Sequence, residues 1–327
     1  MQKGNEALVE QRTARAFREL SMNDIEALVQ SLNSLDEGEL GIDMLVACGD
    51  STIGPLRRFL LEGHPRSIFV PRQRAVRALA QLGAKDVLLE YLLSDREISD
   101  PAVAHGEEAV RNTAARALAA WQTEDVYQAL RRMLRSRLTG VIEALGEFRR
   151  PEVVPELVAT LEDDFCRSFA EDALRKVGEL AHHALIDAAR TPDPSGVNEL
   201  PGSQRRRRCA LRLLEPLHLD ADDWRLLAVL LYDRDREIRA RTSAIALRVG
   251  DEPDKKVAAK RLIEALPTAD WLLQGEIEEW LTKGIDFALP AINEEIDRRL
   301  RAPAQVQAKD DILRLLVGVR RAASGDE

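Results

Sequence analysis

AVRALAQLG, at residues 75–83, decides the fold of this chain, because its Ala-Leu pair returns in several later segments. The pairs that recur at the same place within a predicted helix are Ala78-Leu79, Ala117-Leu118, Ala144-Leu145, Ala173-Leu174 and Ala246-Leu247. Their leucines lie 39, 27, 29 and 73 residues apart in succession, and the last gap is close to two repeat lengths. A period of this size predicts a stack of helical hairpins, in which each hairpin buries its apolar face against its neighbours.

The composition also favours an all-α repeat architecture. A chain of 327 residues exceeds the usual ceiling for one globular core, but a solenoid avoids that limit because it grows by adding repeats. Apolar residues make up 45% of the sequence and aromatic residues only 4%, so the apolar part is mostly Ala, Leu and Val. Ala and Leu are strong helix formers. The net charge of −9 suits a soluble protein.

The hydrophobic spacing predicts about eight hairpins between residues 41 and 300. We therefore expect one solenoid over residues 1–327. Residues 1–40 would form capping helices at its start, and residues 301–327 would form a capping helix and a tail at its end. No segment shows the alternation of a β-strand, so no strand is expected.

The ends of the stack are predicted in more detail from capping signals. Residues 4–20 and 23–35 are expected to form two helices, and Ser21 or Asn23 is the expected N-cap of the second. A final helix over residues 306–321 would cover the last hairpin.

Three segments carry a recognisable repeat pattern: AVRALAQLG at 75–83, EAVRNTAARALAAW at 108–121 and DREIRARTSAIALRVG at 235–250. They resemble the HEAT repeat in its short bacterial form, related to the repeats of phycobilisome lyases. The resemblance covers roughly residues 41–300 and implies an α-α superhelix of the armadillo/HEAT type. It specifies packing and not activity. It also implies structural roles at the joints between repeats for Arg77, Arg111 and Arg239.

Three connections between hairpins are longer than the others, at residues 64–74, 94–108 and 191–208. Each joins the second helix of one hairpin to the first helix of the next, so all three are expected to emerge on the same edge of the stack. Insertions on one edge of a solenoid often form its binding surface. We therefore predict that a functional surface lies along this edge.

Clusters of arginine without acidic neighbours occur in two of these joints. Residues 205–208 are four consecutive arginines where a helix should begin, although a helix N-terminus favours anions. They predict a site for phosphate or for an acidic peptide. The alternative is a solvated joint, in which successive side chains fan out by about 100° per residue. The predicted partner-binding residues are Arg66, Arg72, Arg74, Arg205, Arg206, Arg207 and Arg208.

Other basic residues lie near these clusters or at a predicted helix end. Arg77 extends the cluster that begins at Arg66. Arg131, Arg132, Arg135 and Arg137 fall at the end of a predicted second helix, where the helix dipole favours cations.

Nucleic-acid binding is not favoured. The whole chain is acidic, and Phe69 is the only aromatic residue in the first two basic clusters, so base stacking is not indicated. Contact with the nucleic-acid backbone alone stays open.

The sequence shows no constellation that points to catalysis, a cofactor or a metal. His182 and His183 are adjacent on a predicted helix and point about 100° apart, so they do not form the zinc-binding pair of residues i and i+4. No HExxH motif and no Gly-rich phosphate loop occurs.

Cysteine usage and the lack of leader or membrane segments indicate a cytoplasmic protein. Cys48, Cys166 and Cys209 are odd in number and far apart, which is typical of buried thiols in a reducing compartment. The first 20 residues mix both charges and contain no apolar run, so they do not resemble a signal peptide. No stretch approaches the roughly 18 apolar residues of a membrane span.

The favoured hypothesis is a non-enzymatic protein-binding scaffold or adaptor. It would grip a protein or peptide segment, with acidic segments among the candidates, on a concave wall of second helices and on the edge of inserted joints. The alternative is an enzyme or enzyme accessory, similar to bilin lyase subunits or to helical-repeat DNA glycosylases. A purely structural subunit of a larger assembly is a third hypothesis.

Overall fold

The computed structural model describes residues 21–195 and 198–324. The chain divides into two compact units, residues 1–153 (unit 1) and residues 154–327 (unit 2), which are described separately. The first expected capping helix, residues 4–20, lies outside the described residues. One continuous solenoid over the whole chain stays a prediction.

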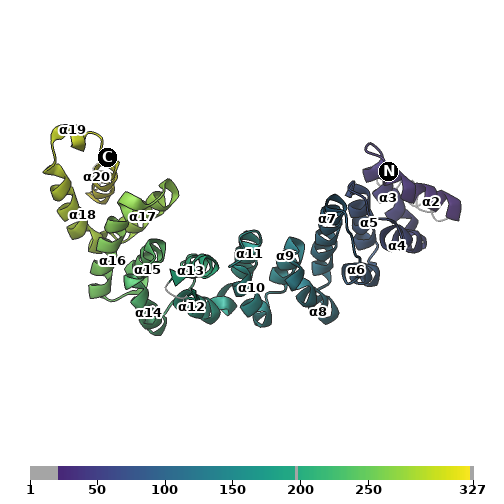
Figure 1. Cartoon of the computed structure of the whole chain (residues 1–327), viewed down its shortest axis with the longest axis horizontal. Helices are drawn as coiled ribbons and strands as arrows, with labels where there is room; N and C mark the ends of the chain where they lie inside the picture. Colours follow the sequence, from purple (N-terminus) through teal and green to yellow (C-terminus); the bar gives the residue numbers. More distant parts are fainter. Residues whose placement is uncertain (1–20, 196–197, 325–327) are drawn as a thin grey trace, which may run out of the picture. The chain divides into compact units, whose positions relative to one another are not determined.

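Unit 1 consists of two rows of helices (Figure 1). The first helices of its hairpins pack side by side, and so do the second helices. The first helices are α3 (Gly38–Cys48), α5 (Val70–Gln81), α7 (Pro101–Leu118) and α9 (Thr139–Phe148). The second helices are α4 (Ile53–Leu61), α6 (Lys85–Leu92) and α8 (Glu124–Met133), and α2 (Met22–Ser31) packs against α3 and α4. Short 3-10 turns lie between helices at η1 (Gly49–Thr52), η2 (Ala119–Trp121), η3 (Leu134–Ser136) and η4 (Pro151–Val153).

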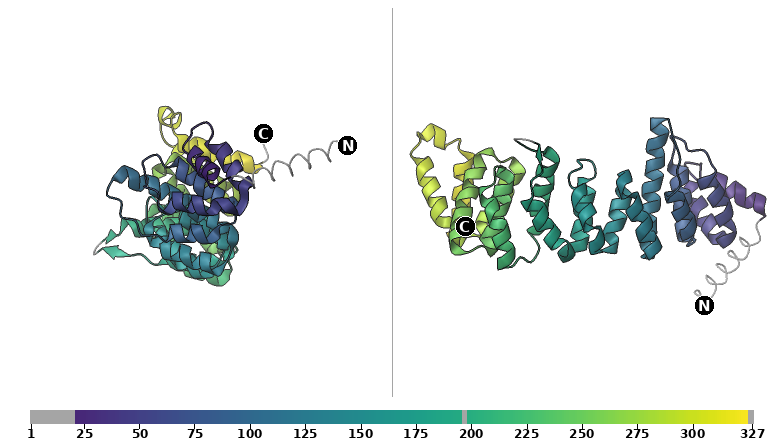
Figure 2. Two further views of the ribbon diagram at one scale, coloured as in Figure 1. Left: turned by 90° about the vertical axis from the view of Figure 1, so that its right-hand side faces the viewer. Right: turned by 60° about the horizontal axis from the view of Figure 1, so that its bottom comes forward.

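Unit 2 repeats this arrangement, and Figure 2 shows the helices of each unit standing side by side. Its first helices are α11 (Arg167–Val177), α13 (Pro201–Leu214), α15 (Arg236–Val249) and α17 (Trp271–Lys283). Its second helices are α10 (Val154–Thr160), α12 (His182–Arg190), α14 (Ala221–Leu227), α16 (Glu252–Ala265) and α18 (Ile285–Leu300). Its 3-10 turns are η5 (Gly178–Ala181), η6 (Ala228–Tyr232) and η7 (Leu266–Thr268). After α19 (Ala304–Gln307), helix α20 (Asp311–Ser324) covers α17 and α18.

The all-α prediction is confirmed for the described part of the chain. In chain order, α3 to α18 make up eight hairpins, as the hydrophobic spacing predicted, and the boundary between the units falls between α9 and α10. No described helix is long and apolar enough to cross a membrane.

The recurring leucines are buried because each lies where a first helix meets its neighbours. Leu79, Leu118, Leu145 and Leu174 are at most 1% exposed. The gap of 73 residues that follows Leu174 holds helix α13, where Ala210 and Leu211 are fully buried. Full burial of one leucine side chain contributes about 1.5–3 kcal/mol, so the repeat pattern marks the residues that hold the stack together.

Ion pairs also connect neighbouring repeats within each unit. Their partners lie about one repeat apart in the sequence, with a separation of 35 residues for Arg72–Glu107, Arg74–Glu39 and Arg241–Glu276. Arg57 and Glu90 are 33 residues apart. The guanidinium groups of Arg72 and Arg241 are buried, so these pairs are shielded from solvent.

Three local predictions need correction or refinement. Ser21 is the N-cap of α2 and forms a capping box with Asp24. The last long helix begins at Asp311 and not at residue 306, because the chain first makes the short helix α19. The inserted joint at 191–208 contains a two-stranded antiparallel hairpin, β1 (Pro194–Ser195) and β2 (Asn198–Glu199). Strands of two residues are too short to show an alternating pattern in the sequence.

The three cysteines are buried free thiols, as predicted. Burial, helped by a contact of 3.0 Å between Sγ of Cys209 and Oε1 of Glu171, raises the pKa of Cys209 to about 12. Burial also raises the pKa of Cys48. We expect a disulfide reagent at pH 8 to modify none of the three thiols of the folded chain, because the thiolate is the reactive form. Counting modified thiols before and after adding denaturant tests this, and rapid modification of the folded chain would contradict it.

Candidate functional site

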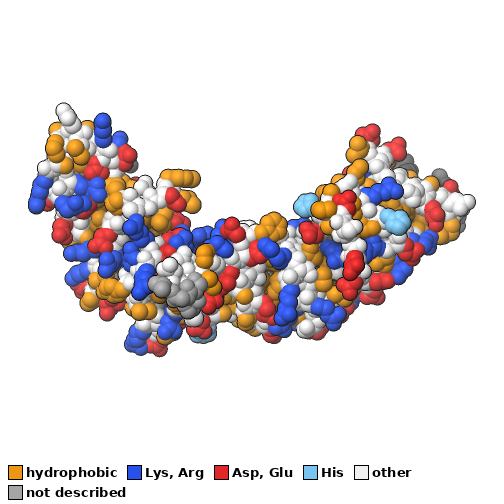
Figure 3. Space-filling model, viewed as in Figure 1, with side chains coloured by type: hydrophobic (Ala, Val, Ile, Leu, Met, Phe, Trp, Pro, Cys, Tyr) orange, Lys and Arg blue, Asp and Glu red, His pale blue; other side chains and the backbone are white. Residues whose placement is uncertain are grey.

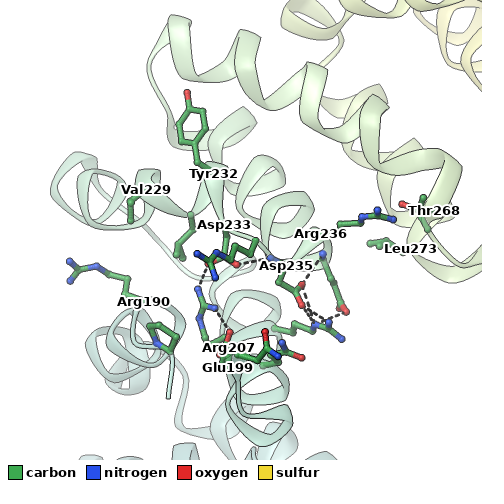
Figure 4. Close-up of a pocket in the computed structure, with 18 of the residues that line it drawn as sticks. Arg190, Glu199, Arg207, Val229, Tyr232, Asp233, Asp235, Arg236, Thr268 and Leu273 are labelled. Carbon is green, nitrogen blue, oxygen red and sulfur yellow. Dashed lines mark hydrogen bonds and ion pairs between the residues drawn. The ribbon is translucent and has the colours of Figure 1, made fainter. Parts of the chain in front are cut away.

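A groove of about 1100 Å³ lies on the edge of unit 2 where the chain passes from second helices to first helices. It is lined by residues of three successive joints, which connect α12 to α13, α14 to α15 and α16 to α17. We call it the joint groove (Figure 4). Its lining includes Arg190, Glu199, Arg207, Tyr232, Arg236 and Leu273.

The inserted joints were expected to share one edge, and within each unit an inserted joint lies beside a neighbouring joint. In unit 1, Nη1 of Arg96 in the second inserted joint donates to the carbonyl of Gly63, next to the first, at 3.2 Å. In unit 2, the third inserted joint lies beside the two joints that follow it and forms part of the joint groove. A common edge for all three joints stays a prediction.

Arg207 is buried beneath the joint groove, with only 3% of its side chain exposed. Its Nε donates to the carbonyl of Ala189 at 2.8 Å and its Nη1 to Oε2 of Glu199 at 2.8 Å. Its Nη2 pairs with Asp233. The expected lack of acidic neighbours is therefore wrong for this residue, because acids from other joints reach it in the folded chain.

The other three arginines of the cluster also have acceptors. Arg208 pairs with Asp235, and its Nε lies 3.4 Å from Oε2 of Glu237. Arg206 pairs with Glu162, and Arg205 donates to the Glu162 carbonyl at 2.9 Å. The four side chains fan out around the start of α13, as the alternative interpretation expected, but they meet protein groups as well as solvent.

The expected lack of acidic neighbours is also wrong for Arg72 and Arg74 of the cluster in unit 1. Nη2 of Arg72 forms a buried ion pair with Oε1 of Glu107 at 3.1 Å. Nη1 of Arg74 donates to the carbonyls of Leu32 and Ser34 at 2.9 and 2.6 Å.

These contacts give Arg72, Arg74 and Arg207 structural roles. The exposed Arg66 forms no ion pair with a described residue. Partner binding by the accessible members of the two clusters, Arg66, Arg205 and Arg208, stays a prediction.

The resemblance to the repeat pattern implied structural roles at the joints for Arg77, Arg111 and Arg239. Arg111 and Arg239 lie at joints, as expected. Nη2 of Arg111 donates to the carbonyl of Ser94 at 2.6 Å, and Nη1 of Arg239 to that of Asp233 at 2.5 Å. Both bonds secure the joint that precedes the residue's own helix. Arg77 instead pairs with Glu39 of the preceding repeat, on the surface.

Three other arginines at the joint groove were not singled out from the sequence. Arg190, Arg234 and Arg236 are exposed and form no ion pair with a described residue. Figure 4 shows Arg190 and Arg236 on opposite sides of the paired Arg207. Each is isolated from other arginines or alternates with acids in the sequence, so only the folded arrangement shows that its charge is not neutralised locally.

The acidic groups of the joint groove, in contrast, are all engaged. Glu199 and Asp233 pair with Arg207, and Asp235 pairs with Arg208. Glu237 accepts from Nε of Arg241 at 2.9 Å, and the carboxylate of Asp270 caps the start of α17. Of the charged side chains of the joint groove that form no ion pair with a described residue, three are cationic (Arg190, Arg234 and Arg236) and one, the helix-capping Asp270, is anionic.

Exposed apolar side chains accompany these cations. Val229 and Tyr232 of η6 both line the joint groove and are 64% exposed. Trp271, at the first position of α17, is 83% exposed and follows Asp270 of the groove wall. An anchoring aromatic side chain next to cations is a common arrangement at protein-binding surfaces.

The ion pair between Asp235 and Arg208 has an electrostatic consequence for the wall of the joint groove. Burial would raise the pKa of Asp235, but the hydrogen bond from Arg208 and those from the backbone amides of Ile238 and Glu237 outweigh it. They hold the pKa of Asp235 below its ordinary value of 3.8.

The stability of unit 2 should therefore decrease in acid. A carboxylate with a lowered pKa in the folded state contributes stability that is present above its unfolded pKa and is lost as the pH falls through the folded pKa. The urea midpoint of unit 2 should fall as the pH drops below about 4. Asp235→Asn should reduce this dependence, whereas Asp297→Asn, at an exposed position of α18, should leave it as in the parent chain. Equal pH profiles for Asp235→Asn and the parent would contradict the prediction.

At the opposite end of α12, the structure brings together groups that the sequence kept apart. His182, His183 and Asp223 each offer one possible ligand atom, and these atoms lie within 4.8 Å of one another. From the sequence, only the two adjacent histidines stood out. Asp223 was not identified, because it comes from the next hairpin.

Residues 91–175 match the family model for HEAT repeats. The match runs from α6 to α11 and includes the segment at 108–121 that carried the resemblance. No curated protein was found to match the chain. The comparison supports the repeat type and does not show the relation to phycobilisome lyases. Repeats of this kind commonly present extended surfaces that bind other proteins.

Proposed function

We propose that this chain, in which residues 91–175 match the HEAT-repeat family model, is a non-enzymatic scaffold that binds an extended acidic segment of a partner protein in the joint groove. The observation that carries the proposal is the imbalance of available charge. Four of the five acids of the joint groove form ion pairs with arginines and the fifth, Asp270, caps α17, while Arg190, Arg234 and Arg236 form no ion pair with a described residue.

The size and lining of the joint groove support a peptide ligand over a small molecule. A volume of about 1100 Å³ lies above the usual range for small-molecule pockets, about 300–1,000 Å³. Such pockets are mostly apolar, but ten of the 19 residues that line this groove carry a charge. An extended segment could place acidic side chains near the arginines and an apolar side chain near Tyr232 or Val229.

The alternatives receive less support. Phosphate-backbone binding requires basic side chains clustered on one face. Figure 3 shows acidic and basic side chains interspersed over the visible face of each unit. Several arginines of the predicted clusters are also committed to ion pairs within the protein. HEAT repeats are typically non-catalytic, which supports a scaffold rather than an enzyme.

A peptide-display library selected on the full chain tests the proposal. We expect the enriched peptides to combine Asp or Glu with an aromatic or aliphatic residue. A variant with Arg190→Glu, Arg234→Glu and Arg236→Glu should bind a selected, fluorescently labelled peptide at least about tenfold more weakly, because attraction becomes repulsion at three points. Fluorescence anisotropy gives the dissociation constants.

A matched control comes from unit 1. Arg132 and Arg135 are exposed and form no ion pair with a described residue, so Arg132→Glu with Arg135→Glu changes the charge without touching the joint groove. This control should retain affinity for the peptide, and the melting temperature of both variants should stay near that of the parent. Selection of basic or neutral peptides, or equal weakening by both variants, would overturn the proposal.

A further inference from the structure

Two histidines and an aspartate converge between neighbouring second helices of unit 2. His182 and His183 are the first two residues of α12, and Asp223 lies in the first turn of α14. Nε2 of His182 is 3.0 Å from Oδ2 of Asp223, and the two imidazole rings have centroids 4.9 Å apart. Helices α12 and α14 pack directly against each other (Figure 1).

The contact between His182 and Asp223 is not an ordinary hydrogen bond. Nε2 of His182 is buried and has no aligned partner, although Oδ2 of Asp223 is within hydrogen-bond distance. Buried ring nitrogens are rarely left without a partner in native proteins. Two ligand atoms that both point at a common ion have this geometry. With metal–ligand bonds of about 2.0–2.2 Å and angles of 90–110°, they lie about 3.0–3.5 Å apart.

The position of Asp223 is fixed before any ligand arrives. Its side chain is the acidic partner in the capping box of α14, and Oδ2 accepts from the backbone amide of Asp220 at 3.0 Å. The residue is only 6% exposed. Such hydrogen bonds to a carboxylate orient it as a ligand in metal sites. His183 is exposed, so its ring can turn to complete the set.

We propose that His182, His183 and Asp223 bind one divalent transition-metal ion of the Zn²⁺ class. Two imidazoles and one carboxylate match the ligands that this class prefers, and they leave at least one position for water. The ion would connect the second helices of two successive hairpins, and would therefore act as a structural link within unit 2. The site stands apart from the joint groove and does not depend on the proposed function.

The test uses the full chain without affinity tag, freed of metal by a chelator. Calorimetric titration with Zn²⁺ should show one ion bound per chain. At a hundredfold excess over the dissociation constant, the melting temperature of unit 2 should rise by about 5–10 °C, since the ion binds the folded state. Substitution with Co²⁺ should give visible bands of nitrogen and oxygen ligation without the intense near-ultraviolet band of thiolate ligands.

Variants locate the site. His183→Ala removes an exposed ligand, so the chain should fold normally and bind Zn²⁺ at least about tenfold more weakly. Asp223→Asn should also weaken binding. His218→Ala removes another exposed imidazole of unit 2 and should bind as the parent does. No stoichiometric binding, unchanged affinity in His183→Ala, or a thiolate band with Co²⁺ would each overturn the proposal.

Discussion

Replacing Arg207 with Ala is expected to lower the free energy of unfolding of unit 2 by about 3–5 kcal/mol. The guanidinium lies between Glu199 and Asp233 and is almost fully buried. Without it, two carboxylates face each other in a poorly solvated region, and the carbonyl of Ala189 loses its donor. Removing one member of a buried ion pair is costly because the remaining charge has no partner.

Urea unfolding followed by tryptophan fluorescence measures this effect. Trp224, Trp271 and Trp280 all lie in unit 2, so the signal reports mainly on that unit. Arg190→Ala serves as the control, because its exposed side chain forms no ion pair with a described residue and should change stability by no more than about 0.5 kcal/mol. An Arg207→Ala chain with parental stability that fails to bind the selected peptide would instead assign Arg207 to partner binding.

A second large effect is expected for Gly140→Ala, which should destabilise unit 1 by about 2–3 kcal/mol. A Cβ atom at this position would lie 2.3 Å from the carbonyl oxygen of Asn112 and 2.7 Å from its Cα. These are backbone atoms of α7, so they cannot move aside as a flexible side chain would. The substitution would also disturb the bond of 2.8 Å from the Gly140 amide to Oδ1 of Asn112, which satisfies a free donor at the start of α9.

Gly275→Ala provides the matched control, since this glycine lies within helix α17 and a Cβ there would meet no atom within 4 Å. It should stabilise unit 2 by about 0.5–1 kcal/mol, because alanine favours helix over glycine. Thermal unfolding followed by circular dichroism compares the two variants with the parent chain. Similar effects of both substitutions would show that helices α7 and α9 do not approach as closely as described.

The helices could be predicted from the sequence because their signal is local and periodic. Leu79, Leu118 and Leu145 occupy equivalent positions in successive repeats, so spacing alone identified them as core residues. The placement of the third inserted joint at an end of its hairpins also followed from the sequence, because an insertion after a second helix emerges at the corresponding end of the hairpin.

The charge partners could not be predicted in the same way. Arg207 meets Glu199 and Asp233, which are 8 and 26 residues away, and only the stacking of hairpins brings all three together. A cluster of arginines without acids nearby in the sequence therefore indicated free charge where the folded chain has ion pairs. The same limitation hid the available charges of Arg190 and Arg236, and the approach of Asp223 to His182.

The ion pairs between neighbouring repeats make the order of the hairpins specific. Arg72 needs Glu107 from the hairpin after it, and Arg74 needs Glu39 from the hairpin before it. Deleting, duplicating or exchanging one hairpin would leave a cation without its anion at one junction, even where the apolar surfaces still fit. The repeats are thus alike in shape but not interchangeable as modules, and a shortened chain designed from them must carry matched charges across each new junction.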